Sequence, residues 1–161
     1  MSWHPAAMRI RVLAATVVVL PLLAACGDAS GSAGGERDLL ANLPSCDRVP
    51  MDEDPEVDTD VPGLALPAGA RITSVVQQGV LTSVEATLRM SPLDVRAHYE
   101  QRTDIDVLRV EDEIFETEVL ARTQQRRMYL RASALCAEGS SLTVVMGPDS
   151  EDAGLPEFRS G

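Results

Sequence analysis

The sequence contains no lysine, so its positive charge comes from 14 arginines alone, set against 25 aspartate and glutamate residues. The formal net charge is −11 at neutral pH. Nucleic-acid affinity depends on Lys and Arg side chains that neutralise phosphates, and a strongly acidic body repels a phosphate backbone. The charge therefore argues against nucleic acid as a partner.

Aromatic residues are also scarce, at 3% of the chain, although hydrophobic residues in total make up 45%. A core must therefore consist mainly of Val, Leu, Ile, Ala and Met side chains. The length of 161 residues suffices for one domain and is short for two.

Histidine is nearly absent, since His98 is the only one that follows residue 26. A Ser-His-Asp triad would have to use it, but no serine lies in a G-x-S-x-G turn, and no glycine-rich phosphate loop is present. The acids between residues 111 and 118 alternate with apolar residues, as they do on an exposed strand. We therefore predict no catalytic residues, no cofactor and no enzymatic activity.

Long hydrophobic runs are missing too. The most apolar stretch, residues 12–25, has 14 residues and contains Thr16 and Pro21, whereas a membrane-spanning helix needs about 20. It follows a short segment that carries Arg9 and Arg11 and no acid. A positive segment, about 7–15 apolar residues and then small residues is the plan of an export signal.

The run ends in Leu23, Ala24, Ala25 and Cys26, a motif that resembles the lipobox of bacterial lipoproteins. The resemblance covers about the first 28 residues and implies cleavage before Cys26, with diacylglycerol on its sulfur. It implies that residues 1–25 are a signal peptide and that the protein is held at the cell membrane, on the extracytoplasmic side. Two or more acyl chains give stable attachment where one does not. The alternative is an ordinary secretory signal, cut near residue 25 or 33, which leaves a soluble protein.

Three cysteines are present, an odd number that needs an explanation in an exported protein. If Cys26 carries lipid, Cys46 and Cys136 remain, and disulfides persist outside the cytoplasm. We predict a bridge between them, with two separate thiols as the alternative. No closely spaced Cys or His motif accompanies them, so we predict no metal site.

Residues 26–63 have the composition of a tether. They begin with a Gly/Ser/Ala-rich segment, 27–35, and include an acidic run, 52–60, in which six of nine residues are acidic. The run fits no EF-hand register, because the required Gly and Glu positions are not both filled. We interpret it as a solvated spacer.

Residues 64–147 have the pattern of a folded domain. Alternating apolar residues predict strands at 71–76 and 80–90 joined by a hairpin, and later at 115–121, 128–136 and 142–147, with a further strand plausible at 106–112. Ser91, Pro92 and Asp94 predict the start of a helix that extends to about residue 103, with Val95 and Tyr99 facing the sheet. Residues 148–161 are predicted to be a disordered acidic tail.

A turn over residues 123–126 sets Val119 opposite Leu130 and Phe115 opposite Ala134, all on the inner face. We predict an α+β fold: an antiparallel sheet in the chain order β-β-α-β-β-β, with one helix packed on a face. The alternative is a β-sandwich with a peripheral helix.

The outer face of the predicted sheet carries Leu120, Tyr129 and Leu135 as a possible partner-binding patch, because contiguous exposed apolar area often marks one. The sequence therefore predicts a membrane-anchored envelope lipoprotein with a non-catalytic domain that binds a protein or an envelope component. A small-molecule or lipid carrier or sensor is the alternative, and an envelope hydrolase is less favoured.

Overall fold

The computed structural model of the protein describes residues 32–159. The predicted signal peptide, Cys26 and the first part of the predicted tether lie outside the described residues. The elements are α1 (Ser32–Ala41), a 3-10 turn η2 (Cys46–Arg48), β1 (Arg71–Gln78), β2 (Leu81–Leu88), α2 (Pro92–Glu100), β3 (Asp106–Glu113), β4 (Glu116–Thr123), β5 (Arg126–Cys136) and β6 (Gly139–Pro148).

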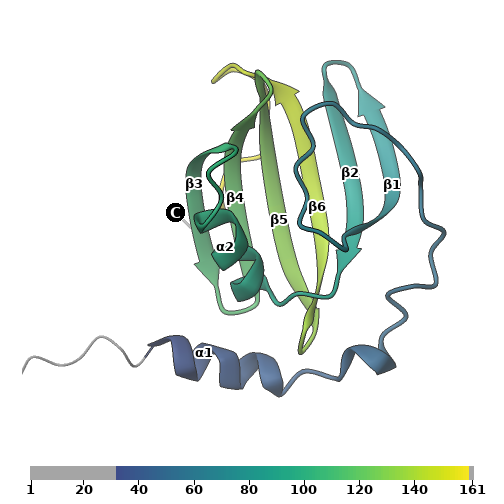
Figure 1. Cartoon of the computed structure of the whole chain (residues 1–161), viewed down its shortest axis with the longest axis vertical. Helices are drawn as coiled ribbons and strands as arrows, with labels where there is room; N and C mark the ends of the chain where they lie inside the picture. Colours follow the sequence, from purple (N-terminus) through teal and green to yellow (C-terminus); the bar gives the residue numbers. More distant parts are fainter. Residues whose placement is uncertain (1–31, 160–161) are drawn as a thin grey trace, which may run out of the picture.

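The six strands form one antiparallel sheet in the spatial order β1-β2-β6-β5-β4-β3 (Figure 1). Strands β3 to β6 follow one another as a meander. Strand β6 also pairs with β2 and so joins the meander to the β1–β2 hairpin. Helix α2 packs on one face, which confirms the coarse prediction of an antiparallel sheet with a helix on it. The predicted order counts five strands, and the structure also contains β3, the further strand that the sequence makes plausible at 106–112. An irregular register at Val107–Arg109 weakens its alternation.

The register between β4 and β5 agrees with the pattern of the sequence. Val119 pairs with Leu130 and Ala121 with Met128, and all four side chains are fully buried. Phe115 lies opposite Ala134 as predicted, because the Ala134 N–H donates to the Phe115 carbonyl at 2.8 Å, but its side chain, in the turn before β4, is 47% exposed. It therefore belongs to one end of the sheet and not to the inner face.

Local signals also place α2 and the first hairpin. The Ser91 hydroxyl accepts a hydrogen bond from the Asp94 N–H at 3.2 Å, and Pro92 occupies the first turn, as expected for a capped helix start. Gly79 adopts a φ of 62° between β1 and β2, a conformation that glycine adopts without strain. The helix ends at Glu100, three residues earlier than predicted.

The core lies between the sheet and a layer made of α2 and the segment 57–70. Val95 and Tyr99 of α2 are fully buried on the sheet, and the Tyr99 hydroxyl donates to the Ala65 carbonyl at 2.8 Å. Val61 is 8% exposed and belongs to the same core. The packed part of the chain therefore begins before the predicted boundary at residue 64.

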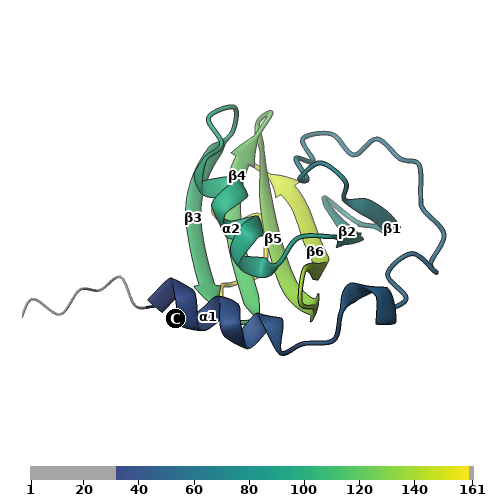
Figure 2. The same cartoon turned by 60° about the horizontal axis from the view of Figure 1, so that its bottom comes forward.

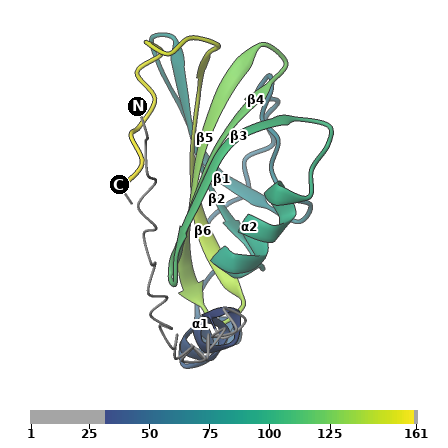
Figure 3. The same ribbon diagram turned by 90° about the vertical axis from the view of Figure 1, so that its left-hand side faces the viewer.

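Residues 149–159 cross the opposite face of the sheet (Figure 3). The Phe158 ring stands edge-on to the Tyr129 ring, with centroids 5.8 Å apart, and the Arg159 N–H donates to Glu118 at 2.9 Å. Ala153 is 7% exposed. The prediction of a disordered tail is therefore wrong for residues 149–159, because a few apolar side chains fix this acidic segment to the sheet.

Helix α1 lies across the end of the sheet where β3 turns into β4 and β5 into β6 (Figure 2). Leu40 is 3% exposed, and Arg37 Nη2 lies 3.1 Å from Asp94 Oδ1. The Ala137 N–H donates to the Pro44 carbonyl at 3.0 Å. Within residues 32–159, no helix is long and apolar enough to cross a membrane.

The sulfurs of Cys46 and Cys136 lie 2.10 Å apart, at the distance of a disulfide, as the predicted pairing requires. Met51 and Leu135 pack around the pair. The segment from α1 to residue 51 is therefore attached to the domain at several points. This part of the predicted tether is packed against the domain.

Candidate functional site: an arginine–aspartate pocket

The predicted patch of Leu120, Tyr129 and Leu135 is not a contiguous exposed surface. Tyr129 is 3% exposed, and Leu135 is half-buried beside the disulfide. Leu120 lines a pocket of about 470 Å³ that the C-terminal segment closes on one side. The outer face at this position is therefore already covered by the chain itself.

Beneath the C-terminal segment, the Tyr129 side chain makes a buried polar contact with Glu118. Its hydroxyl donates to Glu118 Oε1, and Glu118 is only 2% exposed. Burial, and secondarily the bond to Glu118, raises the pKa of Tyr129 well above its ordinary value. The arrangement suits a structural contact, because a tyrosine held in its neutral form does not take part in acid–base exchange near neutral pH.

A larger pocket, of about 750 Å³, is lined by residues that include the β4–β5 turn. Figure 1 shows this turn at the end of the sheet farthest from α1. Three connections meet there: the loop before β1, the link from α2 to β3 and the turn from β4 to β5. The lining residues are Gly63, Leu64, Ala65, Leu66, Arg102, Thr103, Asp104, Ile105, Asp106, Arg122, Thr123, Gln124 and Gln125. Its volume falls within the usual range of about 300–1,000 Å³ for ligand pockets.

One wall of this pocket is an ion pair on the link between α2 and β3. Arg102 Nε donates to Asp104 Oδ1 at 2.9 Å, and Arg102 Nη1 donates to the Ala65 carbonyl at 3.1 Å. The Arg102 guanidinium lowers the pKa of Asp104 to about 2, so this carboxyl is ionised at any physiological pH. The pair ties the link to the loop before β1 and leaves Asp104 facing water.

A second wall of the pocket contains Arg122, which pairs with Asp106 of the lining and with Asp149 outside it. Arg122 Nη1 lies 2.9 Å from Asp106, and Arg122 Nε lies 2.9 Å from Asp149. Asp149 also pairs with Arg127 at 3.2 Å, and these arginines, Arg122 first, lower its pKa. The pocket therefore presents charges of both signs at its two walls.

The turn from β4 to β5 forms part of the pocket rim. Gln124 and Gln125 adopt φ values of 45° and 62°, and both side chains are exposed. The Thr123 hydroxyl beneath them donates to the Gly63 carbonyl and is buried. A Cβ at Gly63 would lie 2.8 Å from that hydroxyl oxygen, so only glycine allows this approach. This turn therefore offers two exposed amide side chains to a ligand.

No residue that lines this pocket is a histidine, cysteine or serine, among the residues that the structure describes. His98 lies nearby on α2, where burial first and Arg102 second lower its pKa. Its ring stands edge-on to the Tyr99 ring, with centroids 5.2 Å apart. The arrangement offers hydrogen bonds and paired charges to a ligand, which is the chemistry of binding.

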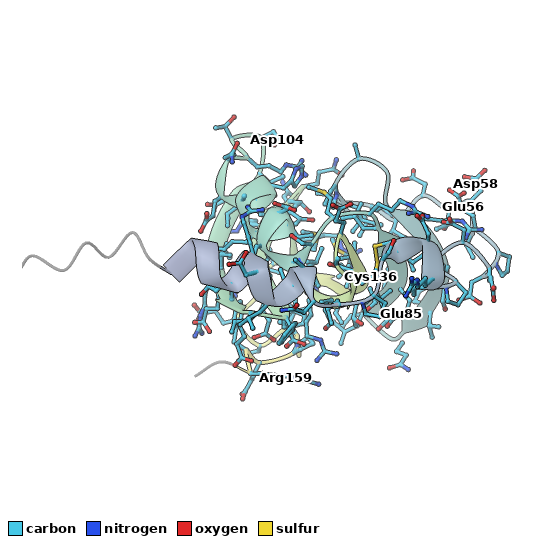
Figure 4. All side chains as sticks on the ribbon, turned by 90° about the horizontal axis from the view of Figure 1, so that it is seen from below. Glu56, Asp58, Glu85, Asp104, Cys136 and Arg159 are labelled. Carbon is cyan, nitrogen blue, oxygen red and sulfur yellow. A yellow bond between two sulfur atoms is a disulfide. The ribbon has the colours of Figure 1, made fainter. Side chains whose placement is uncertain are left out.

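The acidic run lies on the other side of the molecule. Figure 4, seen from the α1 end, places Glu56 and Asp58 beside β1 and away from Asp104. Glu56 lies 3.7 Å from Arg71, and Asp52 lies 3.2 Å from Arg89. Over residues 32–159, no group of three acidic, His or Cys side chains is arranged to hold a metal ion.

No local pattern in the sequence indicates Arg102, Asp104, Asp106 and Arg122 as a set. Arg102 and Asp104 lie in the link from α2 to β3, Asp106 begins β3, and Arg122 lies near the end of β4. Comparison with protein-family models, curated proteins and solved structures finds no match to this chain.

Proposed function

We propose that this protein is an extracytoplasmic lipoprotein, anchored in the cell membrane by diacylglycerol on Cys26, whose domain binds another envelope protein or envelope component. The lipobox-like motif and the disulfide pair support the location. The pocket between Arg102 and Arg122 supports the binding role. This pocket is the observation that carries the proposal, because it combines a ligand-sized volume with paired charges.

A segment of a partner protein fits this site better than a lipid or an apolar metabolite. The pocket is open and its walls carry charge, so peptide groups and charged side chains find complementary partners there. The space between α2 and the sheet, where a carrier would hold an apolar ligand, is filled by side chains such as Val95, Tyr99 and Leu130, all fully buried. The carrier alternative therefore has less support.

Photo-crosslinking tests the binding role. A benzophenone amino acid at Gln125, on the pocket rim, should give a discrete crosslinked product in cells, and the same probe at Val80 should not. Val80 is 69% exposed and lies in the β1–β2 turn, which makes it a matched surface control. The change Arg122→Ala should reduce the product from Gln125. Equal products from both probes, or a Gln125 product that Arg122→Ala leaves unchanged, would contradict the proposal.

A further inference from the structure

The anchored chain has little length between the membrane and the domain. Six residue steps separate Cys26 from Ser32, the first residue of α1. Each step spans at most about 3.6 Å, so the separation cannot exceed roughly 22 Å whatever its conformation. If Cys26 carries lipid, the start of α1 lies within that distance of the bilayer.

Because helix α1 is attached to the domain, the domain is also held close to the bilayer. The helix and the residues after it are connected to the rest of the domain through the buried Leu40, through the ion pair of Arg37 with Asp94 of α2 at 3.1 Å and through the hydrogen bond from the Ala137 N–H to the Pro44 carbonyl at 3.0 Å. The disulfide at Cys46 follows a few residues later. The end of the sheet that α1 crosses is therefore the end nearest the lipid.

Two exposed apolar side chains lie at that end. Phe115, 47% exposed, is in the β3–β4 turn, and Leu39, 44% exposed, is on α1. Figures 1 and 2 place this turn and α1 at the same end of the sheet. Phe and Leu side chains on a peripheral surface bury themselves at the boundary between lipid headgroups and acyl chains.

From these observations we propose that the α1 end of the domain faces the bilayer and that Phe115 and Leu39 enter its interfacial layer. This inference rests on the proposed lipid anchor at Cys26. Strand β4 runs from the β3–β4 turn to the pocket over eight residues, Glu116–Thr123, and a strand rises about 3.3 Å per residue. The pocket therefore opens some 25 Å farther from the lipid, toward a partner in the envelope.

Tryptophan fluorescence tests the orientation, because the one tryptophan of the sequence, Trp3, precedes Cys26 and is absent from the proposed mature chain. Phe115→Trp and Val80→Trp each introduce a single reporter at opposite ends of the sheet. The protein is extracted from membranes and placed in phosphatidylcholine vesicles with brominated or ordinary acyl chains. We expect the emission of Phe115→Trp to shift to shorter wavelength and to lose intensity in the brominated vesicles, and that of Val80→Trp to change in neither respect.

The outcomes separate this inference from the anchor on which it rests. If the protein floats with the vesicles and Phe115→Trp is not quenched, or if both reporters are quenched equally, the orientation is wrong and the anchor stands. If the protein does not float, or if Cys26→Ser floats equally well, the anchor is wrong and the orientation falls with it. Flotation that depends on Cys26, together with quenching of Phe115→Trp alone, supports both.

Discussion

At the scale of single residues, Gln124 and Gln125 hold the β4–β5 turn in an unfavourable conformation. Their φ values of 45° and 62° match the two central positions of a type I′ turn, which Asn-Gly adopts most readily. We expect Gln124→Asn with Gln125→Gly to stabilise the protein by about 1 kcal/mol, which corresponds to a rise of about 4 °C in Tm. Calorimetry of the soluble Cys26→Ser protein measures this. A Tm no higher than that of a double alanine variant would contradict it.

A second prediction at this scale compares two buried tyrosines. The Tyr129 hydroxyl donates to the Glu118 carboxylate, whereas the Tyr99 hydroxyl donates to the neutral Ala65 carbonyl, which Arg102 also reaches. Hydrogen bonds to charged groups contribute about 1.5–3 kcal/mol and neutral ones about 0.5–1.5 kcal/mol. Urea unfolding should therefore show a larger loss of stability for Tyr129→Phe than for Tyr99→Phe. The reverse order would show that the covered outer face contributes less than its contacts indicate.

At the scale of elements, the disulfide is the connection that fixes the segment before β1. Cys46 and Cys136 are separated by 90 residues, and the chain-entropy model assigns a loop of this length about 4–5 kcal/mol. Cys46→Ser with Cys136→Ser should lower the urea midpoint of the Cys26→Ser protein and make residues 38–51 more sensitive to protease. Unchanged digestion of that segment would mean that α1 and Leu40 hold it without the bridge.

The elements also show what the sequence predicts and what it does not. The β4–β5 register follows from alternation on both strands together with a two-residue turn, and α2 follows from Ser91 and Pro92. Strand β3 is an edge strand with an irregular register, so its alternation is weak. The C-terminal segment is acidic, and the docking of Phe158 depends on a tertiary contact that no local pattern specifies.

The same reason explains why the pocket could not be predicted. Arg102 and Asp104 are near neighbours in the chain, but Arg122 and the loop at Gly63 reach the site only through the pairing of β3 with β4 and the packing of α2. Periodicity identifies faces of strands and helices, and it carries no information about which loops meet at one end of a sheet.

At the scale of the whole molecule, the proposed anchor and the pocket lie at opposite ends of the sheet. A short connection from Cys26 to α1, a disulfide behind it and an apolar contact at Phe115 would hold the domain close to the lipid in a defined orientation. The net charge of the chain from Cys26 onward, with 12 arginines against 25 acids, is −13, and it favours a basic or mixed-charge partner over an anionic one.

The proposed location and orientation depend on whether the Cys26 sulfur carries lipid. The intact mass of the protein recovered from the membrane fraction tests this most directly. The account predicts a chain that begins at Cys26 and is heavier than its amino acids by a diacylglycerol group, with the remaining two cysteines oxidised. An unmodified chain, or one that begins at any other residue, would contradict the account.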